Sequence, residues 1–184
     1  MDTSKILEAD RIKQFEGTPV AAFLSLESFS WLVGESDYFK APASTKYHGN
    51  YEGGLFDHSF IVMNVLADLT KQNNLVWQRE ESPYIIGLLH DLCKVNQYRE
   101  TDVGEEYPYE YRKDTLLTGH GDKSVMVAST LIQLTEEEMY CIRYHMGSFT
   151  DKAEWEYYTR AISKYPNVLW THHADMIATH IIGT

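Results

Sequence analysis

The chain has 184 residues, of which 43% are hydrophobic and 13% aromatic, values typical of one folded domain with a sizeable core and not of a disordered tail. Its formal net charge of −11, from 27 acidic and 16 basic side chains, disfavours a protein that follows a long nucleic acid, because phosphate backbones are bound chiefly by clustered Lys and Arg. A small phosphorylated ligand remains compatible with this charge, since bound metal ions would supply local positive charge.

The sequence contains no apolar run of the roughly 18 to 20 residues that would cross a bilayer, and residues 1–5 lack the charged start and apolar core of a signal peptide. We therefore expect a cytoplasmic protein with no membrane partner. In that reducing compartment, Cys93 and Cys141 are expected to be free, buried thiols.

Helical periodicity dominates the chain, with apolar residues recurring at three- and four-residue steps. Ser82 before Pro83 suits an N-cap followed by proline in the first turn, and Thr135 followed by Glu138 has the pattern of a capping box. Besides the two helices that these signals open, the sequence predicts helices over residues 5–15, 20–33, 59–70, 123–134, 152–164 and 168–182.

Two long connections, residues 34–54 and 95–119, are the least helical parts of the chain and are rich in Tyr, Gly, Pro and charge. A short β-hairpin around residues 98–112 would fit within the second. Both connections flank the candidate metal ligands described next, so we expect them to form the substrate-binding loops.

The pair His90 and Asp91 closes an apolar helical run that is too hydrophobic to be a solvated surface. Buried polar groups need partners, and the simplest partner common to several such groups is a metal ion. A lone histidine on an apolar face is usually a hydrogen-bonded core residue, but several buried imidazoles and carboxylates together would be costly without one. The other candidate ligands, each on a different helical segment, are His58, His120, His145 and Asp175.

These ligand types discriminate among metals and among site types. Imidazole and carboxylate without thiolate favour Mn, Fe, Ni, Co or Zn over a structural cysteine zinc site. Four histidines and two aspartates exceed what one catalytic ion needs if positions must stay open for water and substrate. We therefore predict two divalent transition-metal ions, with Asp91 as the best candidate for a shared carboxylate.

The ordered set His58, His90–Asp91 and Asp175 resembles the H…HD…D signature of the HD-domain metal-dependent phosphohydrolase superfamily. Residues 53–59 (GGLFDHS) and 88–94 (LLHDLCK) are similar to the two most recognisable segments of that family. The resemblance covers residues 46–182 and leaves helices within residues 1–34 outside it. It implies a single all-α HD-domain helical bundle.

The same resemblance implies residue roles. His58, His90, Asp91 and Asp175 would hold one ion, while Asp91, His120 and His145 would hold the second, as in dinuclear branches of the superfamily. Cys93 stands where the family commonly has a small residue, a departure that we expect to change packing more than chemistry. Apart from the resemblance, a helix cannot aim both His172 and His173 in the direction of Asp175, so these two are expected to support the site from outside or to lie at the surface, and His180 is expected at the surface.

Three residues are candidate substrate contacts. Lys94 follows His90 by four residues, hence on the same side of a continuing helix, and the resemblance suggests that it contacts a phosphate or orients the site beside the catalytic Asp91. The bland alternative is a solvated lysine at a helix end. His48 and Lys123 are weaker candidates because only their proximity to ligands in the sequence supports them.

The expected reaction is hydrolysis of a phosphoester or phosphoanhydride by metal-activated hydroxide. A mononucleotide, a cyclic nucleotide or a short oligonucleotide fits the acidic charge, and loop tyrosines could stack on a base. Two alternatives stay open: a mixed-valence di-iron HD-domain oxygenase, and a nucleotide-binding regulatory module. The oligomeric state is not predicted.

Overall fold

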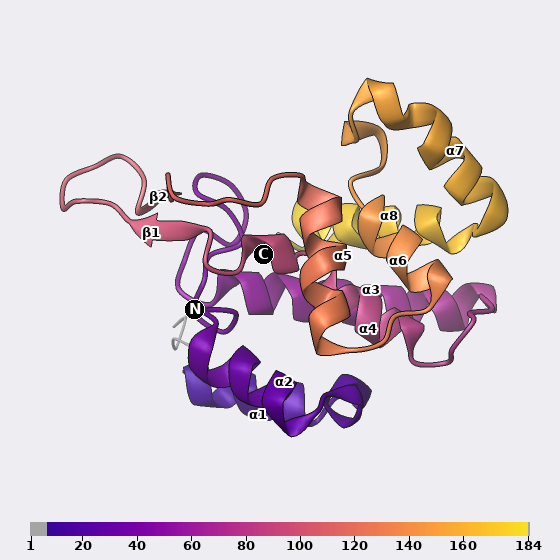
Figure 1. Cartoon of the computed structure of the whole chain (residues 1–184), viewed down its shortest axis with the longest axis horizontal. Helices are drawn as coiled ribbons and strands as arrows, with labels where there is room; N and C mark the ends of the chain where they lie inside the picture. The colour runs from indigo at the N-terminus through magenta and orange to yellow at the C-terminus, as the bar shows by residue number, and fades with distance from the viewer. Residues whose placement is uncertain (1–6, 184) are drawn as a thin grey trace.

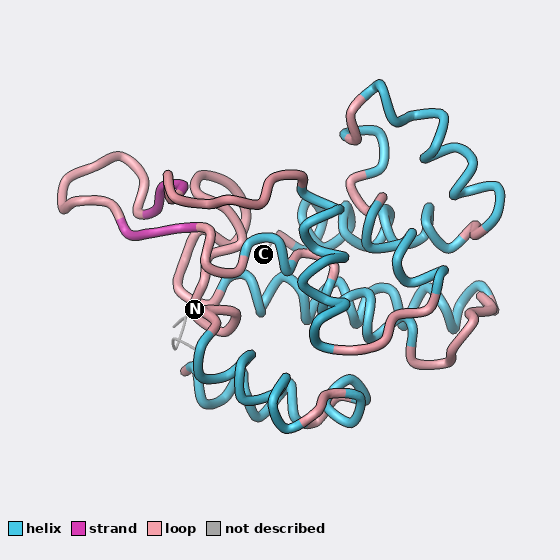
Figure 2. Tube along the Cα trace, viewed as in Figure 1, coloured by secondary structure: helices cyan, strands magenta, loops and turns pink. Residues whose placement is uncertain are grey.

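Eight α-helices and one two-stranded hairpin form the part of the chain that the computed structural model describes, residues 7–183 (Figure 1). The predicted all-α bundle with a short β-hairpin is thus confirmed (Figure 2). The helices are α1 Glu8–Glu16, α2 Leu26–Ser30, α3 Gly54–Asn73, α4 Ser82–Leu89, α5 His120–Leu131, α6 Glu136–Arg143, α7 Trp155–Lys164 and α8 Asn167–Ile177.

The centre of the bundle is the long helix α3, which packs against α4 and α8. Gly87 of α4 makes the approach to α3 possible, because a Cβ atom at this position would lie 2.2 Å from the Cα atom of Met63. Apolar side chains of both helices, among them Leu66, Ile86 and Leu89, are fully buried in one continuous core. The glycine contact therefore fixes the spacing of the two helices that carry His58 and precede His90.

The predicted continuous helix over residues 20–33 is wrong. A 3-10 turn, Pro19–Phe23, gives way to extended backbone at Leu24, and α2 then begins beyond Ser25, whose side chain accepts a hydrogen bond from the Ser28 amide. The N-cap preference of serine overrides the periodicity of the surrounding apolar residues. A π-helical turn, Trp31–Glu35, follows.

Helix α1 begins at Glu8, and residues 5 and 6 of the helix predicted there lie outside the described residues. The N-terminal segments share the core of the rest of the chain, since the buried side chains of Phe15, Val20 and Leu32 belong to the same hydrophobic cluster as those of α3 and α4.

Several boundaries shift by a few residues. The predicted helix 123–134 is α5, which begins earlier, at His120; the last predicted helix divides into α8 and a π-helical turn, Ala178–Ile182. A 3-10 turn, Lys152–Glu154, precedes α7. The capping box of Thr135 and Glu138 is present at the start of α6, whereas Ser82 is the first residue of α4 and Glu81 the N-cap.

The predicted hairpin pairs β1, Tyr98–Glu100, with β2, Tyr109–Tyr111, in antiparallel register with Tyr98 opposite Tyr111. It projects from the helical body beside the connection that precedes α3 (Figure 1). The two long connections touch, because the Lys46 ammonium lies 4.6 Å from the ring centre of Tyr107. Among the described residues, no helix combines the length and apolar character needed to cross a membrane.

Candidate metal centre

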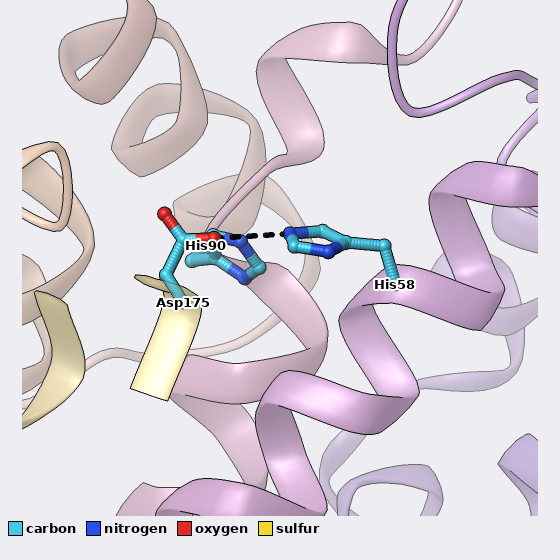
Figure 3. Close-up of side chains that lie close together, drawn as sticks. All are labelled: His58, His90 and Asp175. Carbon is cyan, nitrogen blue, oxygen red and sulfur yellow. Dashed lines mark ion pairs between the residues drawn. The ribbon is translucent and has the colours of Figure 1, made fainter. Parts of the chain in front are cut away.

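All six predicted ligands converge at one place in the bundle. His58 lies on α3, His90 and Asp91 directly follow α4, His120 is the first residue of α5, His145 follows α6, and Asp175 lies on α8. Figure 3 shows His58 and Asp175 pointing toward each other from their two helices, with His90 beside them; the His58 Nε2 atom is 3.2 Å from Asp175 Oδ1.

Asp91 stands between two sets of imidazoles. Its Oδ1 atom is 2.9 Å from Nε2 of His120 and 3.6 Å from Nε2 of His145. Its Oδ2 atom is 3.5 Å from Nε2 of His90 and 3.7 Å from Nε2 of His58. The two oxygens of one carboxylate therefore face different ligand pairs, which is the arrangement expected of a bridge.

The donor atoms are close enough to share ions. Three overlapping groups each bring their ligand atoms within 4.8 Å of one another: His58, His90 and Asp175; His90, Asp91 and His145; and Asp91, Cys93 and His120. These residues could therefore hold divalent metal ions, and Asp91 belongs to two of the three groups.

Two of the imidazoles are fixed by backbone hydrogen bonds. Nδ1 of His90 lies 2.9 Å from the Gly87 carbonyl oxygen, and Nδ1 of His145 lies 2.7 Å from that of Ile142. A carbonyl oxygen can only accept, so in each neutral ring Nδ1 carries the proton and Nε2 keeps its lone pair toward Asp91. This is how proteins commonly orient histidine ligands.

Nε2 of His90 is an uncompensated polar atom. The His90 side chain is completely buried, yet within the described part of the chain Nε2 makes no hydrogen bond. Buried polar atoms are nearly always paired, because desolvation without a partner costs about 1–3 kcal/mol. A lone pair buried in this way beside a carboxylate fits a metal ligand.

The electrostatics of the cluster favour ionised carboxylates. Burial alone would raise the pKa of Asp91, but the Lys94 ammonium and the neighbouring imidazoles outweigh it and hold that pKa well below its ordinary range. Asp175 behaves likewise, because the hydrogen bond from His58 and nearby imidazole charge lower its pKa against the effect of burial.

The histidines differ from one another in the same field. Burial lowers the pKa of His90 to about 3 and also lowers that of His120. For His145, burial acts in the same direction, but the hydrogen bond and charge of Asp91 outweigh it and raise the pKa. Neutral imidazole, the form that binds metals, is therefore favoured at His90 and His120.

The predicted ligands differ in their exposure to solvent. The His58, His90 and His145 side chains are at most 1% exposed, whereas those of His120 and Asp175 are 33% and 16% exposed. Solvent therefore reaches the centre at His120 and at Asp175.

The structure places Lys94 differently from the prediction of a continuing helix. Helix α4 ends at Leu89, Asp91 has φ −107° and ψ 18°, and a 3-10 turn, Leu92–Lys94, follows. This turn brings Lys94 Nζ back to Asp91 Oδ2, to which it donates a hydrogen bond of 2.6 Å. Lys94 thus contacts the proposed bridge and is buried with it.

The two weaker candidates have separate surroundings. The ring of His48 lies 4.8 Å from that of His58, centre to centre, and burial followed by the charge of His58 lowers its pKa to about 4. Lys123 is buried on α5, where its Nζ donates to Gln97 Oε1 at 3.0 Å. His48 therefore lies against the predicted ligand His58, and the substrate roles of His48 and Lys123 both stay predictions.

Sequence reasoning missed two supporting contacts. Cys93, expected to change packing more than chemistry, places its Sγ atom 3.1 Å from Nδ1 of His120, and burial raises the pKa of its thiol to about 12. His172 lies with Nδ1 2.8 Å from the carbonyl oxygen of His145. For Cys93, its position two residues after Asp91 was the only sequence signal of a contact with the centre. For His172, the only signal was its closeness to Asp175 in the sequence. His173 and His180 are exposed, as expected for surface residues.

Comparison with known proteins found no matching family model, no matching curated protein and no matching solved structure. The functional assignment therefore rests on the residues and geometry of this centre.

Proposed function

We propose that this chain is a metal-dependent phosphohydrolase of the HD-domain type, which cleaves a phosphoester or phosphoanhydride bond of a nucleotide or short oligonucleotide. The observation that carries the proposal is the position of Asp91, whose Oδ1 faces His120 at 2.9 Å while its Oδ2 faces His90 at 3.5 Å. Such a carboxylate suits two ions held side by side, the arrangement used by many enzymes that displace oxygen at phosphorus.

In this proposal the two ion positions share Asp91. One would be held by His58, His90, Asp91 and Asp175, and the other by Asp91, His120 and His145. Divalent transition-metal ions at these positions would lower the pKa of a coordinated water toward neutrality and neutralise charge that develops on phosphoryl oxygens.

The residues of the chain contribute orientation and charge. Gly87 and Ile142 carbonyls hold the rings of His90 and His145, so that no reorganisation is needed when charge develops. Lys94 Nζ, which donates a hydrogen bond to Asp91 Oδ2, would add positive charge beside the shared carboxylate. His48, packed on His58, is the nearest candidate for a further hydrogen bond to the substrate.

The size of the substrate follows from the charge of the chain. With 27 acidic against 16 basic side chains and no run of Lys and Arg, a long polyanion would be repelled beyond the centre. One or two phosphates at the metal ions avoid that repulsion, which favours a nucleotide or a short oligonucleotide.

A hydrolysis assay with a nucleotide panel in Mn²⁺, on protein purified without chelator, tests the proposal. We expect turnover that chelator abolishes and that Asp91→Asn loses together with bound metal. Lys94→Met should keep both ions and lose roughly 10²- to 10³-fold in kcat, the usual effect of removing one charge-stabilising group. Lys13→Met, which removes an exposed lysine on α1, is the matched control and should retain full activity.

Two results would contradict the proposal. Bound iron with oxygen consumption and no phosphate release would favour a di-iron oxygenase built from the same ligand types. Tight nucleotide binding without turnover would favour a regulatory module.

A further inference from the structure

The thiol of Cys93 touches the metal centre without being one of the six predicted ligands. Its Sγ atom is 3.1 Å from Nδ1 of His120 and 4.0 Å from Nε2 of the same ring. Sulfur therefore faces the side of the imidazole that points away from Asp91, since Nε2 is the nitrogen that lies 2.9 Å from Asp91 Oδ1.

The backbone of Cys93 is attached to the same helix that carries His120. Its amide donates a hydrogen bond of 3.1 Å to Oγ of Ser124, which follows His120 by one turn of α5. The Cys93 side chain is 1% exposed, so its sulfur has little freedom to move away from the ring. Backbone and side chain together hold the 3-10 turn after Asp91 against the start of α5.

Two fully buried rings of the centre, those of His90 and His145, also have a partner at Nδ1. His90 and His145 each direct Nδ1 to a carbonyl oxygen three residues earlier and Nε2 to Asp91. His120 is the first residue of its helix, and the carbonyl three residues before it belongs to the preceding loop. Its Nδ1 meets Cys93 Sγ instead, and cysteine sulfur is a weak hydrogen-bond acceptor.

We infer that Cys93 is a positioning residue for His120: its sulfur accepts a hydrogen bond from the Nδ1–H group of the ring, which leaves the Nε2 lone pair directed at the second ion beside Asp91 Oδ1. This inference rests on the proposed dinuclear centre, to which the buried, uncompensated Nε2 atom of His90 gives independent support. A partner of this kind typically changes metal affinity about 10- to 100-fold.

The test is a metal titration of the full chain, stripped and reloaded with Co²⁺ or Mn²⁺, for wild type and three variants. Cys93→Ala should weaken the second ion roughly 10- to 100-fold and leave the first unchanged. Cys93→Ser, which keeps a hydrogen-bond acceptor, should lose less affinity for the second ion than Cys93→Ala does. Cys141→Ala removes the other buried thiol, which lies in α6 and belongs to none of the three groups of possible metal ligands, and this variant should still bind two ions with wild-type affinity.

A second readout does not depend on metal affinity. In the ¹⁵N spectrum of protein loaded with diamagnetic Zn²⁺, the His120 ring of wild type and Cys93→Ser should show a protonated Nδ1 with Nε2 as the ligand, and Cys93→Ala should lose that preference. If Cys93→Ala fails to fold, the wild-type spectrum remains a test, because an unprotonated Nδ1 in the His120 ring would overturn the inference.

Three results would overturn the inference. Unchanged affinity and unchanged ring nitrogens in Cys93→Ala would show that sulfur plays no part in positioning. Thiolate-to-Co²⁺ charge-transfer absorption that disappears in Cys93→Ser would make Cys93 a direct ligand instead. Wild type that binds a single ion would remove the dinuclear proposal and the inference with it, whereas the first two results leave the dinuclear proposal intact.

Discussion

Gly87 contacts both helix α3 and the candidate metal centre, because its Cα lies against the backbone of Met63 and its carbonyl oxygen accepts a hydrogen bond from His90. Gly87→Ala is therefore the most informative single change. A methyl group there would lie 2.2 Å from Cα and 2.6 Å from the backbone nitrogen of Met63. Non-bonded carbons prefer about 3.5–4.0 Å, and backbone atoms cannot rotate away, so α3 and α4 would have to separate by more than about 1 Å.

The expected magnitude combines two effects. Overpacking of this kind costs about 1–3 kcal/mol, and rigid backbone on the facing helix places Gly87 at the upper end. Alanine regains up to about 1 kcal/mol over glycine through its helix propensity. The net loss in free energy of unfolding should therefore be about 2 kcal/mol, which lowers Tm by about 4–8 °C for a chain of this size.

Urea unfolding followed by far-UV circular dichroism, with chelator present so that metal binding does not contribute, measures this loss. Gly34→Ala is the matched control, because its methyl group would meet nothing within 4 Å. A free energy of unfolding for Gly87→Ala within about 0.5 kcal/mol of wild type would refute the close approach of α3 and α4. Metal uptake should fall as well, because the Gly87 carbonyl orients His90.

Other predictions concern stability, pH and substrate. Glu138→Ala should lower the free energy of unfolding in urea by about 3 kcal/mol, the lower end for a broken buried ion pair, because its partner Arg79 is 20% exposed. Glu136→Ala, at an exposed ion pair, should cost far less. Equal losses would argue against a stabilising ion pair between Glu138 and Arg79. Burial raises the pKa of Asp37, although the Asn96 amide donates a hydrogen bond to its carboxylate. Above this raised pKa, Asp37 is ionised in the folded protein and lowers the free energy of unfolding. Below the ordinary pKa of an aspartate, Asp37 is protonated in both the folded and the unfolded chain, and this loss disappears. Asp37→Asn should therefore gain stability over wild type at neutral pH, a gain that fades as pH falls; a gain independent of pH would contradict this assignment. Activity per scissile bond should be higher on mononucleotides and short oligonucleotides than on a long single strand, and a strong preference for the long strand would favour a nuclease.

Much of the fold could be predicted from the sequence, because apolar residues that recur at helical spacing over several turns identify helices that bury one face. Helices α3, α4 and α8 follow this rule, and the capping box at Thr135 follows from local hydrogen bonding alone. Residues 20–33 do not follow this rule, because the side chain of Ser25 accepts a hydrogen bond from the Ser28 amide and so begins a new helix instead of continuing the preceding one. Local competition of this kind is hard to weigh against periodicity without the tertiary contacts.

The convergence of the candidate ligands was predictable because buried imidazoles and carboxylates on separate helices need common partners. Their supporting contacts were not. The position of Lys94 depends on the backbone turn at Asp91, and the contact of Cys93 with His120 depends on how the 3-10 turn meets α5. Both are consequences of packing between elements, which residue spacing does not encode.

The central claim is that Asp91 bridges two metal ions. Anomalous diffraction from crystals of protein purified without chelator, collected at the absorption edge of the metal that it contains, tests this claim most directly. We expect two peaks, one on each side of the Asp91 carboxylate. One should lie among His58, His90 and Asp175, and the other between His120 and His145. A single peak bound only by His58, His90, Asp91 and Asp175 would contradict it.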